Sequence, residues 1–181
     1  MLIDTPVCDF GWKAPDFTLK TAVGEEVSMS TQIGQSGLLI AFICNHCPYV
    51  IAIAERLSAD AKTLQSVGIN VLAVMSNDYR NYPADSPPKM IDFSNKYDFQ
   101  FPYLVDEDQS VGRAYNAVCT PDFFGLNKDG ELQYRGRLDD ARMGDASSRK
   151  PELLDAMYLV AETGKGPLEQ TPSMGCSIKW R

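Results

Sequence analysis

Two runs of apolar residues, bounded by glycine or polar positions, predict the central strands of a sheet. The first covers residues 38–43, and the second covers residues 69–75 and is rich in β-branched residues. Between them, apolar residues recur at the three- and four-residue spacing of one helical face: Ile51, Ala54, Leu57, Ala61 and Leu64. Gly68 follows, at the position where helices commonly end in glycine. This part of the chain is therefore predicted to alternate strand, helix and strand.

The rest of the pattern predicts smaller elements. It indicates an opening strand at 14–19 turned back by 23–27, a helix after the polar, proline-rich stretch 76–88, a strand at 101–105, a short helix at 110–116, a hairpin of 122–126 and 131–135, and a last helix at 151–162. Strands that alternate with helices, followed by a hairpin and a helix, imply an α/β fold with a mixed sheet flanked by helices on both faces. We expect one domain over residues 1–181, with an N-terminal β extension and an irregular tail at 163–181.

Composition narrows the class of protein. Of the 181 residues, 44% are hydrophobic and 23% are charged, as in an average folded domain. The formal net charge of −7 disfavours nucleic acid and anionic membrane surfaces as partners. No apolar run reaches the length of a membrane-spanning helix, and residues 1–6 lack the pattern of a signal peptide. We therefore expect a cytoplasmic protein.

The stretch Cys44-Asn45-His46-Cys47 is the strongest indication of chemical function in the sequence. It ends the first central strand and precedes the predicted helix. A CxxC pair can close into a disulfide, and the free N–H groups and positive dipole end of a helix stabilise a thiolate. The five cysteines, an odd number, do not suggest a structural disulfide framework: Cys8, Cys44, Cys47, Cys119 and Cys176. The sequence thus predicts a redox-active dithiol.

A metal site is a weaker interpretation of this stretch. The CxxC pair could supply half of a zinc site, but the chain has a single histidine, no second CxxC and three scattered cysteines. We therefore expect neither a metal ion nor a cofactor. His46 lies between the two cysteines, where an imidazolium would stabilise a neighbouring thiolate. A solvent-exposed histidine with no chemical role is the alternative.

The motifs around this dithiol resemble those of the thioredoxin-fold redoxins, a group that includes AhpC/TSA peroxiredoxins and TlpA/ResA-type thiol–disulfide proteins. The resemblance is carried by residues 11–19, 42–48, 104–106 and 114–124, and the tail at 172–180 is similar to a peroxiredoxin-like subgroup with CNHCPY at its centre. It implies a thioredoxin-like fold. It also implies that Pro121, after Thr120, is cis and faces the CxxC pair.

Departures from the two family patterns rank the activities. Aligned on Cys47, the proline and threonine of a peroxiredoxin site are replaced by Ile40 and Cys44. The tryptophan and buried aspartate that precede the first cysteine of thioredoxin are replaced by Ile43 and Leu38. The proton acceptor must therefore come from elsewhere in the chain or be a water molecule.

We accordingly expect first a thiol–disulfide oxidoreductase that cycles Cys44–Cys47. Cys44, at the exposed edge of the helix, is predicted to attack with a lowered pKa, and Cys47, one turn inside, to resolve the mixed disulfide. The first alternative is a thiol peroxidase that uses Cys47. The second is a non-enzymatic redox sensor or partner-binding protein, with the 76–88 stretch and the tail as its binding surface.

Two further thiols are candidates for resolving or auxiliary roles. Cys119 directly precedes Thr120, but a buried strand cysteine is the favoured interpretation. Cys176 lies in a tail segment with little capacity for regular structure, from which it could fold over the site or reach a neighbouring subunit. An ordinary exposed tail cysteine is an equally good interpretation of Cys176. The expected partners are a protein or small-molecule thiol or disulfide substrate and an unidentified thiol reductant. A charged cluster after the hairpin has no predicted role: Arg135, Arg137, Asp139 and Asp140.

Overall fold

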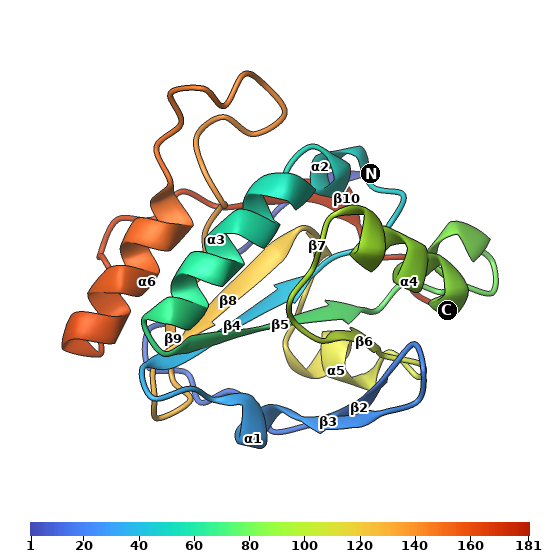
Figure 1. Cartoon of the computed structure of the whole chain (residues 1–181), viewed down its shortest axis with the longest axis horizontal. Coiled ribbons are helices and arrows are strands. Elements are labelled where there is room, and N and C mark those ends of the chain that lie inside the picture. The colour runs from blue at the N-terminus through green and yellow to red at the C-terminus, as the bar shows by residue number, and fades with distance from the viewer.

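The central sheet of the computed structural model, which describes residues 1–181, has seven strands in the order β3-β2-β6-β5-β4-β8-β9 (Figure 1). The strands are β2 (Thr18–Thr21), β3 (Glu26–Ser28), β4 (Gly37–Phe42), β5 (Ile69–Met75), β6 (Tyr103–Val105), β8 (Asp122–Leu126) and β9 (Leu132–Tyr134). The central pairs β4–β5 and β5–β6 are parallel, whereas β8 pairs antiparallel with β4. The sheet is mixed, as predicted, and the segments that follow β4, β5 and β6 lie at one edge of it.

Helices cover both faces of this sheet. They are α1 (Met29–Gln32), α2 (Pro48–Ile51), α3 (Ala54–Ser66), the 3₁₀ helix η1 (Pro83–Asp85), α4 (Pro87–Lys96), α5 (Ser110–Ala114) and α6 (Glu152–Thr163). Figure 1 shows α3, α4 and α6 on one face and α1 and α5 on the other. The single helix predicted after Cys47 is divided into α2 and α3, and Ile53 forms the N-cap of α3. This division leaves a separate short helix beside the dithiol.

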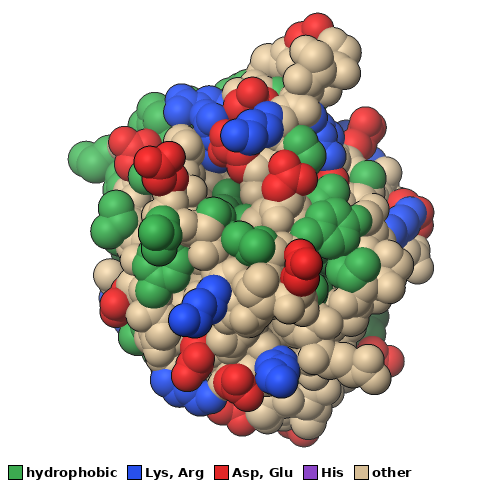
Figure 2. Space-filling view, turned by 90° about the vertical axis from the view of Figure 1, so that its left-hand side faces the viewer, with side chains coloured by type: hydrophobic (Ala, Val, Ile, Leu, Met, Phe, Trp, Pro, Cys, Tyr) green, Lys and Arg blue, Asp and Glu red, His purple; other side chains and the backbone are tan.

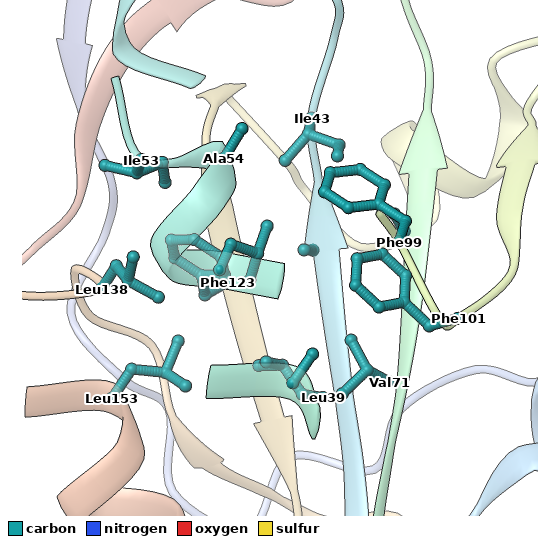
Figure 3. Close-up of a cluster of buried hydrophobic side chains, with 14 of the residues drawn as sticks. Leu39, Ile43, Ile53, Ala54, Val71, Phe99, Phe101, Phe123, Leu138 and Leu153 are labelled. Atoms are coloured by element: carbon teal, nitrogen blue, oxygen red, sulfur yellow. The ribbon is translucent and has the colours of Figure 1, made fainter. Parts of the chain in front are cut away.

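The two faces of β4 belong to two different cores. Leu39 and Ala41 face the larger cluster, while Leu38, Ile40 and Phe42 face the smaller one. All five are fully buried, because helices cover the sheet on both sides. Figure 3 shows side chains of the larger cluster that converge between the sheet and the α3 and α6 helices: Leu39, Ile43, Ile53, Ala54, Val71, Phe99, Phe101, Phe123, Leu138 and Leu153. Cys44 and Cys47 belong to this cluster as well.

A second, three-stranded sheet joins the two ends of the chain. Its order is β1 (Leu2–Asp4), β10 (Met174–Ser177) and β7 (Cys119–Thr120), and both pairings are antiparallel. The prediction of an irregular tail is therefore wrong for β10. Its sequence has little intrinsic strand preference, but hydrogen bonding to a strand on each side overrides that preference. A Cβ on Gly175 would lie 1.9 Å from the Thr120 carbonyl oxygen, so glycine permits this close pairing.

The surface carries charges of both signs. Seen from the side of α6, Lys and Arg side chains are interspersed with Asp and Glu side chains, and hydrophobic ones gather in small groups (Figure 2). None of the helices combines the length and the apolar character that crossing a bilayer requires.

Candidate active site

The CxxC stretch forms the link between β4 and α2. Cys44 follows the strand, and Cys47 is the N-cap residue of α2, with Pro48 in the first helical turn. Proline suits this position because it needs no N–H partner there, and it holds the preceding residue extended. Cys47 accordingly has φ −70° and ψ 121°. Its sulfur is thereby placed at the start of the helix.

Thr120 contacts both sulfurs from β7. Its hydroxyl oxygen lies 3.3 Å from Cys44 Sγ, and its carbonyl oxygen lies 3.1 Å from Cys47 Sγ. The Thr120–Pro121 peptide bond is cis, which confirms that prediction. The structure thus brings Cys44, Cys47, Thr120 and Pro121 together, although the two pairs are far apart in the sequence.

Both sulfur-bearing residues are buried. Cys44 is 1% exposed and Cys47 is 0% exposed. The expectation that Cys44 lies at an exposed helix edge is therefore wrong. Two segments distant in the sequence cover the pair: the loop of residues 76–86, called here the Asp85 loop, and the tail strand β10.

The Asp85 loop places a carboxylate beside Cys44. Asp85 is 0% exposed and accepts hydrogen bonds from the Asn45 backbone N–H at 2.8 Å and the Asn77 amide at 2.9 Å. His46 Nδ1 lies 2.7 Å from Asp85 Oδ2, an ion-pair distance, although the ring is not aligned for a hydrogen bond. The His46 ring also stacks on Tyr82, with 5.9 Å between centroids. His46 therefore lies between the buried carboxylate and the exposed edge of the loop.

Asp85 is the main site residue that the sequence analysis missed. A signal for it exists in the order of elements. Because β4 and β5 are parallel neighbours, the loop after β5 must open at the same sheet edge as the dithiol after β4. An acidic residue in that loop is consequently a candidate to approach the cysteines.

The surroundings of the two thiols shift their pKa values in opposite directions. The pKa of Cys47 is lowered to about 4, from an ordinary value of 9.0, chiefly because the Cys44 thiol donates a hydrogen bond to its sulfur. Burial opposes this shift, and the backbone N–H groups of Cys176 and Val50 favour it. The pKa of Cys44 is raised, because its proton is held in the bond to Cys47, burial disfavours its anion and Asp85 repels it.

The prediction of a Cys44 thiolate is therefore wrong, and Cys47 is the thiolate of the pair. The physical reason is the position of each sulfur. Cys47, at the helix start, receives N–H donors, while Cys44 lies beside a carboxylate. To form a disulfide, this pair must lose the Cys44 proton and give up two electrons to an oxidant such as a substrate disulfide.

Cys176 reaches the same site from the tail. It pairs with Thr120 in the β10–β7 register, which brings it beside Cys47, because the Thr120 carbonyl oxygen contacts the Cys47 sulfur. Burial, followed by this contact with Cys47, raises the pKa of Cys176. Cys119 differs, since it is fully buried and its thiol points to the Pro121 carbonyl oxygen at 3.7 Å. Burial raises the pKa of Cys119 as well.

The charged cluster after the hairpin is divided between the two sides of the sheet. Arg135 forms a buried ion pair with Asp122 at 2.9 Å, and Asp122 lies opposite Phe42, on the face away from the dithiol. Arg137 pairs with Glu152 and lines a small pocket, of about 30 Å³, that also includes Pro121. These arginines are thus engaged in ion pairs of their own.

The potential metal ligands are more numerous than the sequence suggests. Cys44, His46 and Asp85 offer one atom each, and these atoms lie within 4.8 Å of one another. Thiolate, imidazole and carboxylate are the donor types that bind zinc. The sequence argument against a metal counted cysteines and histidines alone and omitted Asp85.

The C-terminal residues connect the two covering segments. Lys179, which follows β10, donates its backbone N–H to Asn77 Oδ1 at 2.9 Å, and its carbonyl oxygen accepts from the Asp78 N–H at 2.8 Å. Arg181 adds a side-chain contact with Asp78 at 3.3 Å. Since Asn77 also binds Asp85, the tail and the Asp85 loop form one hydrogen-bonded unit over the dithiol.

Comparison with known proteins connects this geometry to a family. The model described as the AhpC/TSA family matches residues 10–135. Thioredoxin-like protein YneN of Bacillus subtilis (strain 168) is 30% identical over 127 residues, which cover 68% of each protein. A crystal structure of an uncharacterized conserved protein from Geobacillus kaustophilus is 36% identical, covers 100% of this chain and 97% of its own, and has a TM-score of 0.93. A hypothetical protein from Sinorhizobium meliloti 1021 is 35% identical, with 98% of both chains covered and a TM-score of 0.90.

Proposed function

Because this chain belongs to the AhpC/TSA family of thioredoxin-fold redoxins, we propose that it is a thiol–disulfide oxidoreductase that cycles Cys44–Cys47 between dithiol and disulfide. The family membership and the thioredoxin-like fold confirm the resemblance noted in the sequence. The observation that carries the finer proposal is that Thr120 contacts both sulfurs, with its hydroxyl oxygen 3.3 Å from Cys44 Sγ and its carbonyl oxygen 3.1 Å from Cys47 Sγ. One residue thus holds the nucleophile and the thiol that resolves it side by side.

The reaction starts from the Cys47 thiolate. This thiolate attacks one sulfur of a substrate disulfide, whose S–S bond breaks, and the leaving thiolate takes up a proton. Cys44 then loses its proton and attacks the Cys47 sulfur of the mixed disulfide. The Cys44–Cys47 bond forms, and the second substrate thiol leaves. An external thiol reductant returns the pair to the dithiol.

Asp85 is proposed as the group that receives the Cys44 proton. Its carboxylate lies within 4.8 Å of the Cys44 sulfur and is fully buried. Leu38 occupies the position of the buried aspartate in thioredoxin, so this chain supplies the acid from another segment. A carboxylate positioned beside a thiol can take its proton as the thiol attacks.

The proposal is tested by disulfide-reductase turnover with insulin as the substrate and dithiothreitol as the reductant. Replacing either Cys44 or Cys47 with serine is expected to lower turnover by about a hundredfold or more, since each sulfur supplies a covalent step. Cys119→Ser is the matched control, a buried thiol on the neighbouring strand, and should retain activity. A wild-type protein that forms the Cys44–Cys47 disulfide without turnover would favour the non-enzymatic sensor.

Thiol peroxidase activity is the second candidate, and the environment of Cys47 favours it. The pKa of Cys47 is lowered, with contributions from the N–H groups of Val50 and Cys176, at the position that aligns with the attacking cysteine of a peroxiredoxin. Cys44 stands where a hydroxyl donor would orient the peroxide, so we expect slow peroxide reduction. Fast peroxide turnover that survives Cys44→Ser and is lost in Cys47→Ser would make the peroxidase the main activity.

A further inference from the structure

The cycle proposed above requires thiols that exchange with molecules outside the protein, yet neither active-site sulfur is accessible. Cys44 and Cys47 are 1% and 0% exposed. The Asp85 loop covers the first, and β10 covers the second. Direct exchange of Cys47 with an outside molecule therefore requires β10 to move aside, whereas a thiol on β10 itself is reached without such a movement.

Cys176 is the thiol that β10 carries. It is only partly buried, whereas Cys44, Cys47 and Cys119 are all buried. Its position is fixed, because β10 pairs with β1 on one side and with β7 on the other. It also packs against the core cluster that contains both active-site cysteines. One surface of this residue thus faces solvent, and the other faces the dithiol.

Two observations place Cys176 beside Cys47. Cys176 lies opposite Thr120 in the strand register, and the Thr120 carbonyl oxygen is 3.1 Å from Cys47 Sγ. β10 also packs against α2, the helix that Cys47 caps, and the proximity of the two cysteines shifts the pKa of each. Cys47 is therefore flanked by two thiols, Cys44 on the buried side and Cys176 on the solvent side.

We propose that Cys176 is a third redox-active thiol, through which electrons from an external dithiol reductant reach the buried Cys44–Cys47 disulfide. The proposal rests on the proposed dithiol cycle and adds its route of access. Cys119 pairs with Ser177, the residue after Cys176. It has no such role, because its thiol points to the Pro121 carbonyl oxygen.

The relay consists of two thiol–disulfide exchanges. In the first, Cys176 gives up its proton and attacks the Cys47 sulfur; the Cys44–Cys47 bond breaks, the Cys47–Cys176 bond forms, and Cys44 takes up a proton. In the second, a thiolate of the reductant attacks the exposed Cys176 sulfur, and Cys47 leaves as a thiolate. The second thiol of the reductant then releases Cys176 and closes the reductant's own disulfide. The low pKa of Cys47 makes it a good leaving group in the second exchange.

Two measurements test the relay in the full-length chain. The first follows the reduction of oxidised protein by dithiothreitol, with acid quenching, alkylation and mass spectrometry to identify the remaining disulfide. Cys176→Ser is expected to slow this reduction by about tenfold or more, and Cys119→Ser to leave it unchanged. Equal rates in these two variants would overturn the relay. Thermal unfolding of both variants checks that neither substitution has disturbed the fold.

The second measurement removes Cys44 and asks which thiol replaces it. Mild oxidation of Cys44→Ser with diamide should give a Cys47–Cys176 disulfide by peptide mapping. Its absence would overturn the proposal, because the first exchange needs these two sulfurs to reach bonding distance. Failure of the dithiol cycle itself is recognised separately: wild-type protein would then form no Cys44–Cys47 disulfide on oxidation.

Discussion

The Asp85 loop and the tail strand β10 cover the same dithiol with opposite chemistry. The loop brings a fully buried carboxylate to the side of Cys44, and the tail brings N–H and S–H donors to Cys47. A nearby negative charge raises the pKa of a thiol, whereas hydrogen-bond donors lower it by stabilising the anion. The interaction between the two cysteines contributes most to both pKa shifts, and the covering segments add to it: the loop helps to raise the pKa of Cys44, and the tail helps to lower the pKa of Cys47.

The largest expected effect comes from removing one sulfur at a time. In wild-type reduced protein, thiolate absorbance should rise as the pH increases through about 4, the pKa of Cys47, and this rise should be lost in Cys47→Ala. Cys44→Ala should keep the transition but move it to higher pH, because the thiol that donates to Cys47 is gone. A transition near pH 4 that survives in Cys47→Ala and disappears in Cys44→Ala would show that Cys44, and not Cys47, is the thiolate.

A smaller effect is expected from loosening the tail. In Gly175→Ala the new Cβ would meet the Thr120 carbonyl oxygen at 1.9 Å, so β10 must move away from β7. We expect a loss of about 2 kcal/mol in the free energy of unfolding, and a higher pKa of Cys47 as the Cys176 N–H withdraws. Thermal unfolding and thiolate titration measure the two effects. Ser177→Ala, in the same strand, is the control and should change neither.

The smallest effect tests the loop. Asp85→Asn removes the charge that opposes ionisation of Cys44, so the pKa of Cys44 should fall. The titration is best followed in a Cys47→Ala background, where Cys44 has no neighbouring thiolate. Asp92→Asn, on the exposed surface of α4, is the control. An unchanged titration would show that the Asp85 carboxylate has no influence on the thiol beside it.

The sequence predicts the framework of this site well. The β-branched run at residues 69–75 has the same bounds as β5, because a strand buried on both faces needs a continuous apolar segment. The CxxC position between strand and helix and the cis bond before Pro121 are also as predicted. These features follow from the apolar pattern of neighbouring residues and from the CxxC and Thr-Pro motifs, and both can be read from a single sequence.

The features that the sequence does not reveal depend on long-range contacts. The strand at Met174–Ser177 exists because β1 and β7 flank it, and nothing in its own residues favours a strand. The burial of Cys44 depends on Asp85, forty-one positions later in the sequence. Exposure and pKa of the two thiols follow from these contacts, so the CxxC motif alone does not predict that Cys44 is buried or that its pKa is raised.

The place of β10 in the chain has a consequence for biosynthesis. Cys44 and Cys47 are translated long before residues 174–177, and at about 5–20 residues per second the interval is roughly ten seconds. Throughout that time the segment that shields Cys47 does not exist. The nascent dithiol is therefore exposed to cellular oxidants and thiols, and its protected chemistry begins only when the tail is made and docks beside Thr120.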